Sequence, residues 1–322
     1  MSPFLPKSVS PPLVDSHGRV IRKLRVQLTD ACNFRCFYCM PKDVRFTPRP
    51  ELLSATELLD ICAALVDLGI SEIRLSGGEP MLREDFDEIV EGLSQLSLLK
   101  LGLTTNGFFL NDKLAFLKKT RCQYINISLD SLDESRFNAI TRTRHFKEVY
   151  GAVLRAKEMG FPVKVNVVVM RGVNEDEIFK FIDFSAKYQI EVRFLELMKI
   201  GPQYTYQPRR FVCAREIIRK IEEVETLTPQ SVNVDSTAFN FKTARGGHIG
   251  FIASESQSFC QFCSRLRLTA KGQLRACLML NDGVNLRGRL KEEYPQLLKH
   301  VLAMKPTGRI DYLEQPMYQI GG

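Results

Sequence analysis

The chain has 322 residues, of which 44% are apolar and 25% charged, a composition typical of a soluble globular protein with a substantial core. The net charge of +8 favours an anionic partner, but no dense Lys/Arg run or aromatic-interleaved basic patch predicts nucleic-acid binding. No apolar stretch approaches the roughly 20 residues that span a membrane, and residues 1–20, with four prolines, do not form a secretory signal, so we expect a cytoplasmic protein with a flexible N-terminal arm.

Beyond residue 20, short apolar segments alternate with longer amphipathic ones. The short segments are bounded by turn residues and predict strands at Leu24–Thr29, Glu72–Ser76, Lys100–Thr104, Tyr124–Ser128, Val163–Val169 and Glu191–Glu196. The amphipathic segments predict helices at Thr56–Leu68, Arg83–Leu96, Asp112–Lys119, Lys147–Met159 and Asn174–Lys187. Ser54 and Glu57 have the spacing of a capping box at the start of the first helix.

This alternation of strand and helix predicts an α/β fold with a parallel sheet and right-handed crossovers. An open doubly wound sheet and a partial barrel both fit the pattern, and both gather functional groups at the C-terminal ends of the strands. The pattern changes after Gly201, where a loop precedes helices expected at Arg215–Glu223 and Lys291–Ala303. We therefore predict a boundary near residue 200, between residues 21–200 and a smaller α+β domain at 201–322.

Nine cysteines without a secretory signal point to metal binding or redox chemistry rather than to disulfides. Cys62 and Cys122 lie in apolar helix or strand patterns, where we expect buried structural thiols. Six of the others form two groups. The first group, which we call the first thiol trio, directly follows the first strand and comprises Cys32, Cys36 and Cys39.

Three thiolates on one short loop can hold three irons of a cubane cluster and leave the fourth iron open to a ligand. The alternative is a structural zinc site, but zinc needs four ligands, and none of the four histidines lies within the motif.

With Tyr38 just before its third cysteine, the first thiol trio resembles the signature of the radical S-adenosylmethionine superfamily. The resemblance implies a 4Fe-4S cluster whose open iron binds S-adenosylmethionine, with radical chemistry supplied by that cofactor. Ser76-Gly77-Gly78-Glu79-Pro80 is similar to a glycine-rich turn of the same family. By this resemblance, the contacts to S-adenosylmethionine would come from Tyr38, Gly78, Ser128 and Met198.

The second group, the second thiol trio, comprises Cys260, Cys263 and, after thirteen intervening residues, Cys277. Alternation places Arg265 and Arg267 on one face of a strand beside it, and their planar donors suit an anionic substrate. This pattern resembles the C-terminal cluster of the GTP 3′,8-cyclases. The resemblance implies a second 4Fe-4S cluster, whose open iron would bind the purine of GTP.

The same resemblance covers roughly residues 20–322 and implies further site residues. The GTP contacts would come from Arg25, Arg74, Thr104, Lys164, Arg265 and Arg267. The resemblance also implies catalytic roles for Arg25, Arg193, Gly321 and Gly322, with the terminal glycines reaching the active site. Several of these basic residues lie in apolar strands, where an unpaired buried charge is costly and an anionic ligand would relieve the cost. One departure is Glu72, which stands where the family often has lysine.

The implied fold is an incomplete (β/α)6 barrel closed by the C-terminal domain. The implied reaction converts GTP to (8S)-3′,8-cyclo-7,8-dihydroguanosine 5′-triphosphate through a 5′-deoxyadenosyl radical, in the first step of molybdenum cofactor biosynthesis. The implied partners are flavodoxin or ferredoxin as electron donor, cyclic pyranopterin monophosphate synthase and a second copy of the chain.

Two alternatives stay open: a radical enzyme acting on a peptide or another nucleotide, and a cluster-bearing redox sensor or nucleic-acid regulator.

Overall fold

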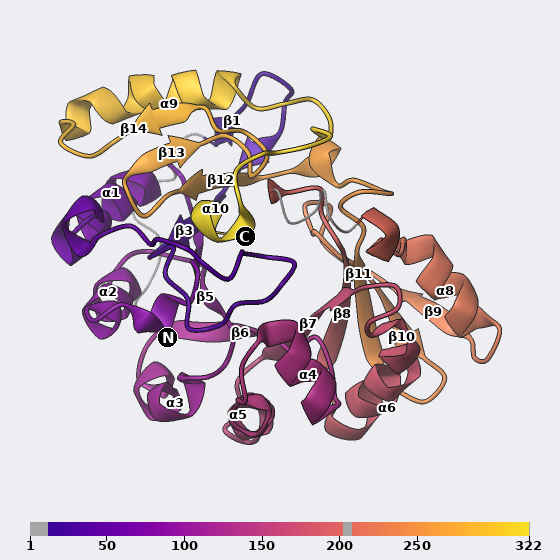
Figure 1. Cartoon of the computed structure of the whole chain (residues 1–322). Helices are drawn as coiled ribbons and strands as arrows, with labels where there is room; N and C mark the ends of the chain where they lie inside the picture. Colours follow the sequence, from indigo (N-terminus) through magenta and orange to yellow (C-terminus); the bar gives the residue numbers. More distant parts are fainter. Residues whose placement is uncertain (1–11, 202–207, 322) are drawn as a thin grey trace, which may run out of the picture.

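The computed structural model describes residues 12–201 and 208–321, whose strands form a twelve-stranded sheet and a separate two-stranded hairpin. The sheet curves, and the helices between its central strands cover its outer face (Figure 1). Six parallel strands form the centre in chain order: β3 (Lys23–Gln27), β4 (Glu72–Ser76), β5 (Lys100–Thr105), β6 (Cys122–Ser128), β7 (Val163–Val169) and β8 (Glu191–Glu196). The curvature agrees with a partial barrel and not with a flat open sheet.

Six helices of the described chain lie on the outer face, and all except α4 agree with the predicted positions to within a few residues. They are α1 (Ala55–Asp67), α2 (Phe86–Ser94), α3 (Leu110–Lys118), α4 (Glu134–Thr141), α5 (Phe146–Glu158) and α6 (Ile178–Tyr188). The predicted capping box of α1 is present, with the Glu57 N–H bonded to Ser54 Oγ at 3.1 Å and the Ser54 N–H to Glu57 Oε2 at 2.7 Å. The sequence analysis missed α4, because its eight residues include only Phe137 and Ile140 as large buried apolar side chains.

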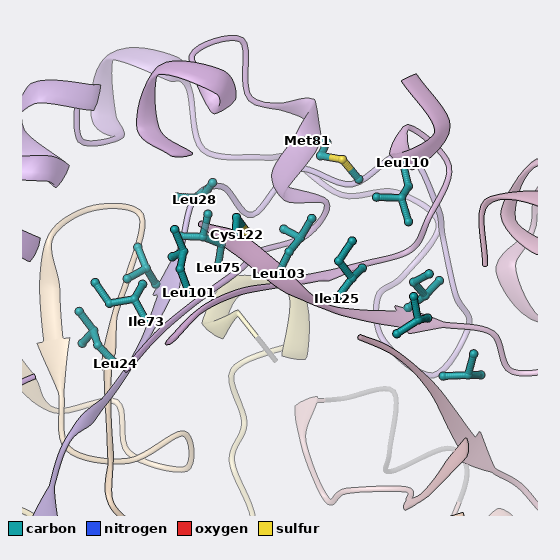
Figure 2. Close-up of a cluster of buried hydrophobic side chains, with 14 of the residues drawn as sticks. Leu24, Leu28, Ile73, Leu75, Met81, Leu101, Leu103, Leu110, Cys122 and Ile125 are labelled. Atoms are coloured by element: carbon teal, nitrogen blue, oxygen red, sulfur yellow. The ribbon is translucent and has the colours of Figure 1, made fainter. Parts of the chain in front are cut away.

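Alternation along the central strands separates an apolar outer face from a polar inner face. Leu24, Ile73 and Leu101 are register neighbours on β3, β4 and β5, and all three are buried. Figure 2 shows them with Leu75 and Leu103 on the face of the sheet that the helices cover. The strand residues between them therefore point to the concave face, where a ligand site can form. Cys62 and Cys122 are fully buried, as predicted.

The C-terminal part of the chain continues the same sheet at both edges (Figure 1). On one side β11 pairs parallel to β8, and on the other side β12 pairs parallel to β3. The strands concerned are β9 (Leu227–Gln230), β10 (Phe239–Thr243), β11 (His248–Ile252), β12 (Arg265–Leu268), β13 (Gln273–Arg275) and β14 (Gly283–Asn285). Its helices are α8 (Ala214–Glu222), α9 (Tyr294–Ala303) and α10 (Met317–Ile320). The division at residue 200 stays a prediction.

Short 3-10 helices complete the described elements. They are η1 (Arg49–Glu51), η2 (Pro80–Leu82), η3 (Glu175–Glu177), η4 (Pro208–Arg210), η5 (Cys260–Phe262) and η6 (Lys291–Glu293). No helix in the described ranges is long and apolar enough to cross a membrane.

The N-terminal region differs from the prediction of a flexible arm over residues 1–20. Strands β1 (Leu13–Val14) and β2 (Val20–Ile21) pair antiparallel, so the prediction is wrong for residues 13–20, while residues 1–11 lie outside the described residues. Asp15 organises the turn, because its carboxylate accepts hydrogen bonds from the N–H groups of His17 and Arg19 at 2.9 Å and from Arg19 Nε at 2.6 Å. The composition of residues 1–20, with four prolines and no long apolar run, did not indicate this buried ion pair.

Candidate active site

The first thiol trio lies on the loop that follows β3, at the C-terminal end of the parallel strands. The backbone N–H groups of Cys39 and Met40 bond to Cys36 O at 3.0 and 3.1 Å, which turns the loop tightly around its cysteines. All three thiols are partly accessible. Burial raises the pKa of Cys32 to about 11 and that of Cys39 to about 12. Forming thiolates here therefore requires added positive charge, which a bound metal supplies.

The glycine-rich turn after β4 packs directly against this loop. A Cβ on Gly77 would lie 2.5 Å from Thr29 O, and one on Gly78 would lie 2.2 Å from Ala31 O, so neither position has room for a side chain. The N–H groups of Gly78 and Glu79 bond to Thr29 O and Ala31 O, both at 2.7 Å. The two glycines thus hold the turn against the cysteine loop, while a contact from Gly78 to S-adenosylmethionine stays a prediction.

Glu79 of the same turn is a fully buried carboxylate that the sequence analysis did not single out. It accepts hydrogen bonds from Thr105 Oγ1 at 2.9 Å and from the Asn106 N–H at 2.7 Å. Burial raises its pKa to about 7 in spite of these bonds. Asn106 in turn places its Nδ2 3.7 Å from Cys32 Sγ, so Glu79 couples the end of β5 to the first thiol trio. The sequence signal that could have identified Glu79 was an acidic residue directly after two glycines at the end of a strand.

Tyr38 is fixed against the end of β6 by a second buried carboxylate. Its hydroxyl donates to Asp130 Oδ2 at 2.7 Å, and Asp130 Oδ1 accepts from the Val168 N–H at 2.8 Å. Burial raises the pKa of Asp130 to about 6. Ser128, two residues before Asp130, is the register neighbour of Asn166 on β7. These contacts bring Tyr38 and Ser128 to the same end of the sheet.

A group of partly buried guanidiniums lines the concave face of the sheet. Arg25 on β3 has Arg74 on β4 and Arg267 on β12 as register neighbours. Burial, together with the charges of these neighbours, lowers the pKa of Arg25 well below its usual value. Arg74 donates to Leu103 O at 3.1 Å, and a Cβ at Gly102 would lie 3.1 Å from its Cζ. Arg25 has no hydrogen-bond or ion-pair partner among the described residues, which is a costly state for a buried cation.

Two further basic residues share one carboxylate on the neighbouring strands. Lys164 Nζ and Arg193 Nε each lie 2.6 Å from an oxygen of Glu191, a partner that the sequence analysis missed. Nearby, Thr104 Oγ1 and Asn166 Oδ1 are buried without a hydrogen-bond partner in the described part of the chain. Buried polar atoms are normally satisfied, so these two orphaned atoms mark places where a ligand can bond.

The second thiol trio lies where η5, β12 and β13 meet. Cys260 begins η5, Cys263 precedes β12, and Cys277 follows β13. Arg265 places its Nη1 3.6 Å from Cys263 Sγ. Burial alone would raise the pKa of Cys263, but the cations of Arg265 and Lys305 outweigh it and leave the pKa below its usual value. This trio is therefore set among positive charges.

The C-terminal helix α10 lies on the concave side of the sheet (Figure 1). Gly321 O accepts from Arg267 Nη1 at 2.8 Å and from Ser76 Oγ at 3.3 Å. A backbone hydrogen bond from Tyr318 reaches the Cys39 thiol. These three contacts tie the end of the chain to β4, to β12 and to the first thiol trio.

The same segment also reaches the second thiol trio through apolar packing. Ile320 belongs to a small buried cluster against which Met198 and Cys277 pack. Gly321 has a φ of +68°, and a Cβ there would lie 2.9 Å from Gln27 Cβ, so glycine is required for both conformation and space. Both trios therefore border one region that the C-terminal segment enters.

Within the described residues, no three His, Cys, Asp or Glu side chains converge as they do around a single metal ion. A cubane cluster is wider than an ion, and its thiolate ligands stand correspondingly further apart. In the first trio, Cys32 and Cys39 still lie near enough to raise the pKa of Cys36 by their charge. Three partly accessible thiols without a fourth protein ligand fit a cluster with one open iron.

Comparisons with known proteins agree with this geometry. Residues 26–185 match the family model for the radical SAM superfamily, and residues 190–309 match the model for Molybdenum Cofactor Synthesis C. The chain is 45% identical to the GTP 3′,8-cyclase of Synechocystis sp. over 98% of this chain and 96% of that protein. It is 38% identical to the GTP 3′,8-cyclase of Thermodesulfovibrio yellowstonii over 96% of this chain and 99% of that protein. The chain belongs to the GTP 3′,8-cyclase family of the radical SAM superfamily.

Solved structures support the fold of this radical SAM protein. Streptococcus suis SuiB bound to S-adenosylmethionine superposes with a TM-score of 0.66 at 14% identity, over 94% of this chain and 79% of that chain. SuiB bound to the precursor peptide SuiA gives 0.67 at 13% identity, over 94% and 77%. At such low identity the likeness concerns the fold alone, and it confirms the predicted mixed α/β radical SAM architecture.

Membership of the superfamily implies S-adenosylmethionine and one 4Fe-4S cluster, which replaces the zinc alternative for the first thiol trio. Apart from Gly322, which lies outside the described residues, each predicted site residue belongs to the inner face, a strand end or the tail segment. Sequence reasoning missed several carboxylates and cations that lie outside the recognised motifs and contact the predicted site residues. They are Glu79, Asp130, Glu191, Lys100, Lys305 and Arg19.

Proposed function

We propose that this protein is a GTP 3′,8-cyclase that converts GTP to (8S)-3′,8-cyclo-7,8-dihydroguanosine 5′-triphosphate in the first step of molybdenum cofactor biosynthesis. The observation that carries the proposal is the row of guanidiniums centred on Arg25, which has Arg74 and Arg267 as register neighbours and no anionic partner among the described residues. Family membership supplies the reaction class. When bound, the first cluster and S-adenosylmethionine supply the 5′-deoxyadenosyl radical that takes the hydrogen from C3′ of the GTP ribose.

The basic residues of the inner face would bind the triphosphate and ribose. Arg25, Arg74 and Arg267 form a continuous row across β4, β3 and β12, and their planar donors match phosphate oxygens. A bound triphosphate would relieve the like-charge repulsion at Arg25. Lys164 and Thr104 would add one ammonium and one hydroxyl from neighbouring strands, and the unpartnered Thr104 Oγ1 supports the latter contact.

Lys100 is a further candidate for the substrate site. It is the register neighbour of Glu72 on the adjacent strand, and both border a small cavity of about 50 Å³ with Arg25, Arg74 and Arg265. Its Nζ lies 4.1 Å from the centre of the Tyr124 ring, and it has no ion-pair partner within the described residues. We infer that Lys100 supplies, from the next strand, the positive charge that Glu72 does not.

The S-adenosylmethionine contacts would come from Tyr38, Gly78, Ser128 and Met198. Tyr38 is held by Asp130, so its position does not depend on the cofactor. Gly78 offers backbone groups in a turn that is packed against the cysteine loop. Met198 packs beside the C-terminal segment, against the cluster that contains Ile320. These residues would orient the sulfonium cofactor and exclude water from it.

The second thiol trio would hold a second 4Fe-4S cluster. Its donor set is again three partly accessible thiols, so one iron would stay open for the purine of GTP. Arg265 and Arg267, which follow Cys263 on β12, would then reach the same nucleotide. The two clusters would divide the work, with the first generating the radical and the second orienting the base.

Arg193, Gly321 and Gly322 would act near the reacting groups. Gly321 O already accepts a hydrogen bond from Arg267, which ties the tail to a proposed substrate ligand. Arg193 is held by Glu191 and shares that carboxylate with Lys164. We further propose a cytoplasmic homodimer that receives electrons from flavodoxin or ferredoxin and passes its product to cyclic pyranopterin monophosphate synthase.

Anaerobic assay of the reconstituted protein tests the proposal. With S-adenosylmethionine, a reductant and GTP, we expect 5′-deoxyadenosine and the cyclised nucleotide in equal amounts. Formation of 5′-deoxyadenosine only with a peptide or another nucleotide would contradict the substrate assignment. Failure to cleave S-adenosylmethionine under any reductant, with DNA or RNA retained at physiological salt, would favour a regulator instead.

A further inference from the structure

Two buried cations outside the predicted site contact the second thiol trio from opposite ends of the chain. Lys305 follows α9 and has only 3% of its surface exposed. Arg19 belongs to the N-terminal hairpin and is 9% exposed. Buried charges are rare unless they are paired or hydrogen-bonded, so the partners of these two residues indicate what they are for.

Lys305 uses its ammonium group to bond the two segments that carry Cys263 and Cys277. Its Nζ donates to Arg265 O at 2.8 Å and to Ala276 O at 3.0 Å. The same Nζ also lies 4.0 Å from Cys263 Sγ. One ammonium therefore joins the start of β12 to the residue before Cys277 and faces a thiol of the trio.

Arg19 fixes the remaining cysteine. Its Nη1 donates to Cys260 O at 2.7 Å, while its Nε is held by Asp15 at 2.6 Å. His17, in the same turn, has its Nε2 3.0 Å from Lys305 O, so the hairpin also grips the backbone that carries the lysine. Arg19 Nη2 is buried and has no hydrogen-bond partner among the described residues.

The two cations are close enough to act on the thiols electrostatically as well as through the backbone. Lys305 Nζ lies 4.0 Å from Cys263 Sγ, and Arg265 Nη1 lies 3.6 Å from the same sulfur. Arg19 Nη1 donates to Cys260 O at 2.7 Å. Among the residues that the structure describes, Asp15 is the one carboxylate paired with these two cations, and it is already engaged by Arg19. Three thiolates carrying an iron–sulfur cluster form a net anion, which such a group of cations suits.

We propose that Lys305 and Arg19 are positioning residues of the second cluster site, which hold its three cysteines in place and raise the reduction potential of the cluster bound there. The inference rests on the proposed second cluster. A fixed positive charge stabilises the reduced cluster more than the oxidised one, because reduction adds one negative charge. The N-terminal hairpin is thereby part of the cluster site and not a mere extension of the fold.

The test uses the full chain with Cys32, Cys36 and Cys39 all changed to Ser, so that iron content and the electron paramagnetic resonance signal report the second cluster alone. In this background we compare Lys305→Met, Lys305→Arg, Arg19→Met and the control Lys271→Met. Lys271 lies at the β12–β13 turn, is exposed and pairs with Glu51 at 2.6 Å. The readouts are iron per chain, the midpoint potential from a redox titration, and the rate of iron loss to a chelator.

For Lys305→Met we expect a lower midpoint potential and several-fold faster iron loss, for Lys305→Arg a potential nearer that of the parent, and for Lys271→Met no change. If Lys305→Met keeps its iron and its potential equals that of the parent, the inference is wrong while the second cluster stands. If the parent variant binds no iron, the proposal of a second cluster is itself wrong. Should Lys305→Met fail to fold or to bind iron, Arg19→Met decides, because an unchanged potential there overturns the electrostatic role.

Discussion

The two thiol trios have the same number of cysteines but opposite electrostatic surroundings. The first is accompanied by the buried carboxylates Asp130 and Glu79, and the pKa of Cys39 is raised to about 12. The second is accompanied by Arg265, Lys305 and Arg19, and the pKa of Cys263 is lowered. A cluster beside carboxylates is harder to reduce than one beside cations, because reduction adds negative charge.

This difference agrees with a division of labour between the trios. A low potential suits a cluster that must pass an electron to a sulfonium, whereas a cationic site suits one that binds an anionic nucleotide and stays in one oxidation state. The guanidinium row through Arg25 crosses β4, β3 and β12, and its proposed ligand is the triphosphate of GTP.

Removing one cysteine from each trio tests the division directly. We expect Cys36→Ser to abolish cleavage of S-adenosylmethionine and to lower the iron content from about eight to about four per chain. Cys263→Ser should abolish cyclisation of GTP but retain part of the uncoupled cleavage, measured as 5′-deoxyadenosine. Equal loss of both activities in Cys263→Ser would show that the trios do not act separately.

Replacing Arg25, at the centre of the guanidinium row, with a neutral residue tests whether the row binds an anion. Arg25→Met should weaken GTP binding by roughly 10- to 100-fold, since a hydrogen-bonded charge contributes about 1.5–3 kcal/mol. The same change should raise the thermal stability of the ligand-free protein, because it removes a buried cation without a partner. Calorimetric titration and thermal unfolding measure the two effects. Reduced stability together with unchanged GTP affinity would contradict the assignment of Arg25.

Replacing Lys100 tests the proposed compensation for Glu72. Lys100→Met should weaken the binding of GTP several-fold and that of GMP much less, because the proposed role of its ammonium is to bind the triphosphate. Lys113→Met is a control away from this cavity, since Lys113 on α3 is paired with Asp87 at 2.8 Å. Equal losses for GTP and GMP would place Lys100 outside the triphosphate site.

The carboxylate side of the comparison can be probed through the pH dependence of folding. Burial raises the pKa of Glu79 from 4.5 to about 7, so the folded state holds its proton more tightly than the unfolded state does. Its contribution to stability is therefore full below pH 4.5 and is lost as the pH rises towards about 7. Glu79→Gln should remove this slope, measured by denaturant unfolding of the metal-free protein. An identical slope in the wild type and the variant would show that Glu79 is ionised throughout.

Local patterns were sufficient for the parts of the fold that depend on neighbours in sequence. The central strands and the cap of α1 appeared where periodicity and the Ser54–Glu57 spacing placed them, because side-chain alternation and capping act within a few residues. The hairpin at residues 13–21 was missed because it depends on Asp15 and on contacts to Cys260 and Lys305, far along the chain. The same reason explains why Glu79 and Glu191 were missed, since each partners a residue that another strand supplies.

The amino-acid sequence by itself determined the two thiol trios, the alternation of strands and helices, and the basic residues that point to one face. Only the tertiary structure decided that β12 joins the sheet beside β3, that the tail enters between the trios, and that Lys305 and Arg19 meet at the second one. A six-stranded parallel core leaves two open edges, and local propensity does not choose which later strand covers which edge. That choice rests on long-range burial and pairing, which appear only when distant segments pack together.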